Sequence, residues 1–176
     1  MTTHIAFFRS LNVGGANVIK MAALTALFTK SGAKNARAYI QSGNVIFESA
    51  HEARVMKGVS QALRDEHSID VPVTLRTPHA LREVLAKNPF TAADNKRVLV
   101  LFMEEGISEA RLAGFDFERS PPDEIRVEAN ARELYLHCPT GIAKTKYTNA
   151  YLDKALGSAS TGRNVNTVDS ILKLAA

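Results

Sequence analysis

The stretch ARAYIQSGNVIF, residues 36–47, decides the fold of this chain. Its flanks, residues 36–40 and 45–47, are rich in strand-forming side chains, whereas the middle contains the pair Ser42-Gly43. Glycine readily adopts the positive φ that a tight turn between two strands requires. The stretch therefore predicts a β-hairpin.

The segments around this hairpin alternate between helical and strand patterns. Together they give the order β-α-β-β-α-β over residues 1–76, which is that of the ferredoxin-like fold. Pro72 lies in the apolar run at residues 71–75, and its missing amide hydrogen suits a strand at the edge of a sheet. The other expected elements are strands over residues 4–9 and 71–75 and helices over about 21–31 and 55–63, the first of them ended by Gly32.

The second half of the chain repeats most of this order. A linking helix is expected to begin at Pro78 after a Thr77 cap, and the apolar run VLVLFM at residues 98–103 predicts a buried central strand. A helix is expected where the last strand of a second copy would fall. The remaining expected elements are a short helix capped by Ser108, a hairpin around residues 129–131, a helix over about 144–156 ended by Gly157, and a helix over about 167–174 capped by Asn166.

These patterns predict an α+β fold, a pseudo-duplicated ferredoxin-like (βαββαβ) sandwich with two intimately packed halves. The N-terminal half is expected over residues 1–76 and a linking helix and loop over 77–96. The C-terminal half, with its terminal helices, is expected over residues 97–176.

Composition narrows the class of protein. The chain has 176 residues, 45% of them hydrophobic, and its single cysteine, Cys138, excludes an internal disulfide framework. The N-terminus lacks the pattern of a secretion signal, and no apolar run is long enough to span a membrane. We therefore expect a cytoplasmic protein without membrane contact.

The net charge of +4 is unevenly distributed. Residues 1–47 contain five basic and no acidic side chains, residues 97–133 five basic against nine acidic, and residues 134–168 four basic against one acidic. If the two basic segments meet, they form one cationic face between the halves that attracts phosphates, carboxylates or nucleic acid. The alternative is a solvated surface with scattered lysines.

Two loops are expected to lie side by side at one end of the N-terminal sheet. The first and third strands of a ferredoxin-like sheet are antiparallel neighbours, so residues 12–15 should adjoin residues 41–44. Neither the Gly14-Gly15 loop nor residues 141–145 match a nucleotide-binding glycine motif. The polar side chains of the two loops bind a ligand or, alternatively, fix the loops through bonds to the backbone.

No catalytic or metal-binding signature is present in the sequence. The five histidines are dispersed without the spacing of metal ligands, and no metal is expected. His137 and Cys138 are adjacent on a predicted strand and point to opposite faces, so Cys138 is expected to pack as a small apolar residue. The sequence leaves open whether the chain is an enzyme, and it identifies no cofactor.

Longer motifs lie at both ends of the chain. They are RSLNVGG at residues 9–15, KM at 20–21, YIQSGNVIF at 39–47, LYLH at 134–137, GI at 141–142, KTK at 144–146, TN at 148–149 and TGRNVNTV at 161–168. In these motifs the chain closely resembles the domain of unknown function family 1697. The resemblance implies a bacterial cytoplasmic protein with two ferredoxin-like halves and supplies no catalytic residues. Ser10 stands where glycine is usual in that family, and Val165 where tryptophan is usual.

The leading hypothesis is a protein that binds a small anionic ligand at a basic face between its halves, with or without enzymatic activity. One alternative is a nucleic-acid-binding module, in which Phe7 or Phe8 and Phe47 stand where RNA-recognition domains stack bases. Core packing also explains these phenylalanines, and the RNA-recognition sequence motif is missing. A protein-interaction scaffold without a ligand is the third hypothesis. The candidate ligand-binding residues are Arg9, Asn12, Gly14, Gly15, Lys20, Gln41, Ser42, Asn44, Lys144, Lys146, Arg163 and Asn164.

Overall fold

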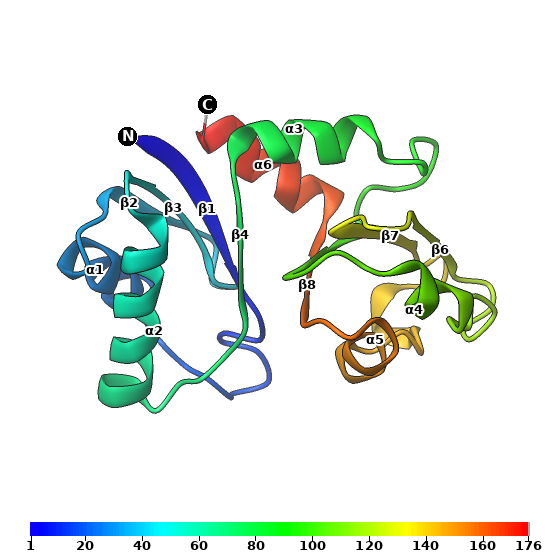
Figure 1. Cartoon of the computed structure of the whole chain (residues 1–176), viewed down its shortest axis with the longest axis horizontal. Coiled ribbons are helices and arrows are strands. Elements are labelled where there is room, and N and C mark those ends of the chain that lie inside the picture. Colours follow the sequence, from blue (N-terminus) through cyan, green and yellow to red (C-terminus); the bar gives the residue numbers. More distant parts are fainter. Residues whose placement is uncertain (176) are drawn as a thin grey trace. The chain divides into compact units, whose positions relative to one another are not determined.

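The computed structural model describes residues 1–175 as two compact units, each built on a four-stranded antiparallel sheet with helices (Figure 1). The N-terminal unit comprises Met1–Ala80 and residues 171–175, and the C-terminal unit comprises Leu81–Ser170. The two similar halves confirm the expected α+β, pseudo-duplicated ferredoxin-like fold.

The N-terminal unit follows the predicted order of elements, including the hairpin around Gly43. Its sheet has the strand order β2-β3-β1-β4, in which β1 pairs antiparallel with both β3 and β4. The strand at the β4 edge begins directly after Pro72, which fits a residue that cannot donate to a ladder. The elements are β1 Thr2–Phe8, α1 Met21–Lys30, β2 Lys34–Tyr39, β3 Asn44–Ser49, α2 Glu52–His67 and β4 Val73–Arg76.

The core of the N-terminal unit lies between this sheet and the helices α1 and α2. Phe28 of α1 packs against Phe8 of β1 and Phe47 of β3, with ring centroids 6.1 and 4.9 Å away. All three rings are completely buried. Alternation along β1 turns Ile5 and Phe7 to the opposite face of the sheet, and both are also fully buried.

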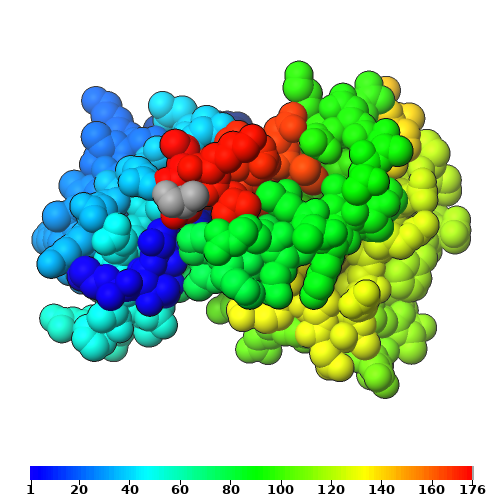
Figure 2. All heavy atoms as spheres, turned by 90° about the horizontal axis from the view of Figure 1, so that it is seen from above, coloured from blue at the N-terminus to red at the C-terminus, as the bar shows by residue number. Residues whose placement is uncertain are grey.

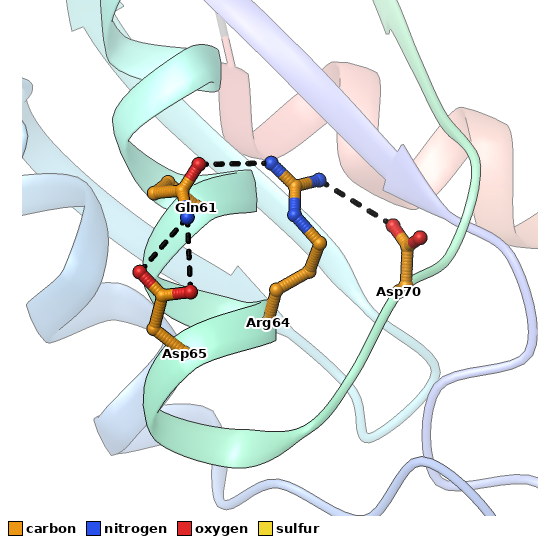
Figure 3. A network of polar contacts seen from close by, with 4 residues as sticks. All are labelled: Gln61, Arg64, Asp65 and Asp70. Atoms are coloured by element: carbon orange, nitrogen blue, oxygen red, sulfur yellow. Dashed lines mark hydrogen bonds and ion pairs between the residues drawn. The ribbon is translucent and has the colours of Figure 1, made fainter.

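Polar contacts at the end of α2 fasten the chain before it enters β4. Arg64 donates to Gln61 Oε1 at 3.2 Å and forms an ion pair with Asp70 at 3.4 Å (Figure 3). Gln61 donates in turn to both carboxylate oxygens of Asp65, at 2.9 and 2.8 Å. Because these side chains are exposed, the network orients the turn and adds little to the free energy of unfolding.

The C-terminal unit repeats the order of the N-terminal one. Its sheet has the order β6-β7-β5-β8, and the apolar strand β5 is central, as predicted. Thr77 accepts from the Ala80 amide at the start of α3, and Ser108 accepts from the Arg111 amide at the start of α4, as the capping patterns predicted. The elements that follow β4 are α3 Pro78–Ala86, β5 Val98–Met103, α4 Glu109–Ala113, β6 Glu124–Val127, β7 Glu133–His137, a 3₁₀ turn Ile142–Lys144, α5 Asn149–Leu156, β8 Ser160–Asn164 and α6 Val165–Ala175.

The end of the chain differs from the prediction in three respects. A strand, β8, completes the second copy where none was expected, and the helix expected over about 167–174 follows it as α6. The sequence of β8, STGRN, has no apolar alternation, so the pattern gave no strand signal. The helix α5 begins at Asn149 after a Thr148 cap, and not near residue 144. Asn164, and not Asn166, caps α6, because its Oδ1 accepts from the Thr167 amide at 2.9 Å.

The last strands of the two units carry a matching arginine. Arg76 on β4 lies opposite Ile5 of β1, and Arg163 on β8 lies opposite Val100 of β5. Both arginines are buried, and each donates to the carbonyl oxygen of the residue before it, at 2.7 and 2.8 Å. The duplication of the fold therefore extends to a correspondence between single residues.

The final turn of α6 belongs to the N-terminal unit. Arg37 on β2 donates to the carbonyl oxygen of Leu174, which ties this turn to an edge strand of the sheet. In Figure 2 the turn, in red, lies against residues of the N-terminal unit in blue and cyan. Both ends of the described range, residues 1 and 175, thus belong to the same unit.

Replacing Gly43 by alanine should destabilise the N-terminal unit strongly. Gly43 has φ +75°, and a Cβ there would lie 2.9 Å from the Cβ of Phe8 and 3.0 Å from a methyl carbon of Leu11. Backbone strain and overpacking together predict a loss of about 3 kcal/mol in the free energy of unfolding, measured by urea denaturation. Gly32→Ala is the control, because Gly32 has φ +96° with nothing within 4 Å of its Cβ position, and it should lose only about 1 kcal/mol. Equal losses in the two variants would contradict this packing.

Tyr135 should make the stability of the protein depend on pH in the alkaline range. Its hydroxyl donates to the Val84 carbonyl at 2.8 Å, and burial, followed by the charges of Glu133 and Glu128, raises its pKa from 10.0 to about 12. The unfolded tyrosine ionises first, so its contribution is complete below pH 10 and is lost between pH 10 and about 12. Tyr135→Phe should therefore be about 1 kcal/mol less stable than the parent at pH 8, and the difference should shrink toward pH 12. A difference in urea midpoints that stays constant with pH would contradict the pKa.

Candidate functional site

Two loops of the N-terminal unit meet at the end of β1. The first loop, residues 9–20, joins β1 to α1, and the second, residues 40–43, joins β2 to β3. The Phe8 amide donates to the Gly43 carbonyl at 2.8 Å, where the ladder between β1 and β3 ends. The expected adjacency of residues 12–15 and 41–44 is confirmed, and we call these two loops the loop cluster.

Asn12 joins the two loops with its side chain. Its Nδ2 donates to the carbonyl oxygens of Ile19 and Gln41 at 3.0 and 2.9 Å, and its Oδ1 accepts from the Ile19 amide at 2.8 Å. Asn12 has φ +55°, a left-handed conformation that asparagine tolerates better than most residues. Its side chain thus holds the loop cluster together and has both polar atoms engaged within it.

Asn44 has a similar role at the base of the second loop. It is completely buried, and its Nδ2 donates to the Tyr39 carbonyl and to the Ser42 hydroxyl, both at 3.0 Å. The amides of Asn12 and Asn44 therefore fix the loops through local bonds, which is the structural alternative that the sequence left open.

The surface of the loop cluster combines open backbone, positive charge and exposed aliphatic side chains. Gly14 and Gly15 are exposed, and a Cβ on either would meet no atom within 4 Å. Lys20 and Gln41 are exposed, and Arg9 is half-buried. The exposed aliphatic residues are Val13, Val18 and Ile40.

These aliphatic residues were missed by the sequence reasoning. Val13 lies in the loop expected over residues 12–15 and Ile40 at the end of the strand expected over residues 36–40, whereas Val18 lies in no expected element. Ile40 instead has φ +51° and is 51% exposed, an unusual conformation for a β-branched residue. The only local signal for this would have been its place directly before the turn.

The candidate residues of the C-terminal unit differ widely in exposure. Lys144, at the end of the 3₁₀ turn, and Lys146 are exposed. Arg163 is buried, and this burial lowers its pKa to about 10, so the guanidinium is still charged at neutral pH. Asn164 caps α6, and Val165, at the position where tryptophan is usual in the family pattern, is buried. Of these residues, the two lysines are the cations most open to a ligand.

Cys138 packs in the apolar core of the C-terminal unit, as predicted. Burial, followed by the charge of Asp123, raises the pKa of its thiol to about 11, so it is a neutral thiol at physiological pH. Within residues 1–175, no group of three or more His, Cys, Asp or Glu side chains is arranged to hold a metal ion. The helices in that range are all too short or too polar to cross a membrane.

Comparison with solved structures finds a similar fold over nearly the whole chain. A solved structure described as the conserved bacterial protein SP0830 from Streptococcus pneumoniae matches with a TM-score of 0.74, covering 99% of each chain at 22% sequence identity. At this identity the likeness shows the fold alone. A search of curated proteins finds no significant match. The family model described as Protein of unknown function (DUF1697) matches residues 1–135, well over half of the chain, and the chain therefore belongs to this family.

Proposed function

We propose that the protein binds a small anionic ligand at the loop cluster of the N-terminal unit. The observation that carries the proposal is the charge of residues 1–47, which contain five basic and no acidic side chains. A surface with one sign of charge attracts ions of the opposite sign and raises their local concentration. Two of these basic residues, Arg9 and Lys20, belong to the loop cluster, which also contains the exposed glycines Gly14 and Gly15.

The start of α1 adds to this attraction. Lys20 occupies the N-cap position without a side-chain hydrogen bond to the helix, and the first turn contains no acidic residue. The first amides of a helix have no partner within the helix, and the helix dipole favours negative charge at this end. An anion there would be attracted by the helix and by the ammonium group of Lys20.

A small ligand is favoured over nucleic acid because the aromatic residues are not available for stacking. RNA-recognition sheets expose aromatic rings on their central strands. Here Phe7 and Phe8 of β1 and Phe47 of β3 are completely buried, and Phe8 and Phe47 form part of the apolar core. Base stacking on these strands would require the core to open.

The exposed side chains of Val13, Val18 and Ile40 favour a second candidate function, contact with another protein. Apolar side chains gathered on loops often mark interaction surfaces. In this reading the loop cluster is a docking surface and the basic residues guide association.

We also propose that Lys144 and Lys146 attract small anions within the C-terminal unit, independently of the loop cluster. Both are exposed, and residues 134–168 contain four basic side chains and one acidic. Arg163 and Asn164 have structural roles in this segment. Arg163 donates to the Gly162 carbonyl, and Asn164 caps α6. A Lys144→Gln variant tests this set separately from the loop cluster.

A thermal-shift panel of phosphate, nucleotides, carboxylates and short oligonucleotides tests the proposal. One class of small anion should raise the melting temperature by about 5 °C at a concentration well above its Kd. Lys20→Gln should reduce this shift by at least half, because it removes an exposed charge at the loop cluster. Lys34→Gln, which removes an exposed charge on β2 outside the cluster, should leave the shift unchanged.

Three results would contradict the anion proposal. No stabilisation by any anion would favour the protein-contact function. Stabilisation that Lys20→Gln leaves unchanged would place the anion elsewhere. Stabilisation by oligonucleotides alone, falling steeply with salt, would favour a nucleic-acid-binding module.

A further inference from the structure

A depression in the C-terminal unit gathers three basic side chains over α4 and α5. Its volume is about 590 Å³, within the range of small-molecule sites. Arg111 and Gly114 line it from α4 and its end, Arg119 from the following loop, and Tyr151, Lys154 and Ala155 from α5. The site lies within one unit and is separate from the loop cluster.

Arg119 is held in place by an aromatic ring and a backbone carbonyl. Its guanidinium carbon lies 3.8 Å from the centroid of the Tyr151 ring, a close cation–π contact. Its Nε donates to the Lys146 carbonyl at 3.1 Å. These contacts orient the guanidinium in advance and leave its two terminal nitrogens for a ligand.

Arg111, a second lining residue, is also held by a backbone carbonyl. Its Nη1 donates to the Lys154 carbonyl at 3.4 Å. Its guanidinium also lies close over Gly157, where a Cβ would come within 3.1 to 3.2 Å of it. The absence of a side chain at residue 157 therefore leaves room for the guanidinium of Arg111.

The three cations have no carboxylate partner within the depression. Among residues 1–175, no ion pair within 4.0 Å joins Arg111, Arg119 or Lys154 to an acidic side chain. Bringing three like charges together costs free energy unless an anion compensates them. Arginine in addition presents a planar fork of donors that matches the oxygens of a phosphate group.

We propose that this depression binds a small molecule that carries a phosphate monoester or pyrophosphate group. Two or more negative charges on one compact group match the three cations better than a single carboxylate does. Gly114 and Ala155 have little or no side chain, which allows the group to approach the helices closely.

The surroundings select a compact anion over a nucleic acid. Glu109 precedes the lining residues of α4, and Asp116 and Glu118 lie in the loop that carries Arg119. These acidic side chains would repel the phosphates of an extended strand running beyond the depression.

Titration of the full-length protein with pyrophosphate and with inorganic phosphate, by calorimetry and by amide NMR, tests this proposal. Saturable binding is expected, with the largest chemical-shift changes at Gly114 and Ala155. Lys154→Gln and Arg119→Gln should each weaken binding about tenfold, the effect of losing one charge-assisted hydrogen bond. Tyr151→Phe should bind like the parent, because it retains the ring under Arg119.

Lys87→Gln is the matched control, since it removes an exposed lysine of the same unit outside the depression and should leave the affinity unchanged. Lys20→Gln should also leave it unchanged, which separates this site from the loop cluster. The NMR map of the parent protein does not depend on whether any variant folds.

Several outcomes would overturn the proposal. These are no saturation by either probe at 10 mM, equal weakening by Lys87→Gln and Lys154→Gln, and shift changes that avoid α4 and α5. Tighter binding of single-stranded RNA than of pyrophosphate, weakened by the same Lys154→Gln, would assign the depression to nucleic acid instead.

Discussion

The end of β1 packs directly against the turn at Gly43, and the N-terminal unit depends on this contact. Phe8 donates from its amide to the Gly43 carbonyl at 2.8 Å, and the missing side chain at Gly43 makes room for Phe8 and Leu11. The contact fixes the register of β1 and β3 and at the same time closes the core. It also brings the two loops together, so the Asn12 side chain can join them. Core packing and the geometry of the candidate site thus have a common origin.

Much of the fold could be predicted from the sequence because its strongest signals are local. The turn pair Ser42-Gly43, the apolar run of β5 and the caps at Thr77 and Ser108 each act over a few residues. The strand β8 gave no such signal, since STGRN is polar and takes its conformation from pairing with β5. Tertiary pairing of this kind overrides local preference. The matching positions of Arg76 and Arg163 show that β8 is nevertheless the counterpart of β4.

The candidate sites, too, combine features that the sequence predicts with features that arise only from tertiary packing. Adjacency of the two N-terminal loops could be predicted, because it follows from the strand order alone. The roles of Asn12 and Asn44 could not, since an amide that fixes a loop and one that binds a ligand look alike in a sequence. Arg119 and Lys154 are 35 positions apart, and Arg119 lies in a segment with more acidic than basic residues. Only the packing of α4 beside α5 brings their charges together.

The position of Cys138 makes it a chemical probe for the opening of the C-terminal unit. It is the sole cysteine of the chain and lies in the core of the C-terminal unit, with a thiol that is both buried and protonated. A thiol reagent can reach it only when that core opens, so the rate of labelling reports the frequency of opening. The N-terminal unit has no cysteine, so it gives no labelling signal in such an experiment. The chain therefore allows the motions of one unit to be timed without any engineered probe.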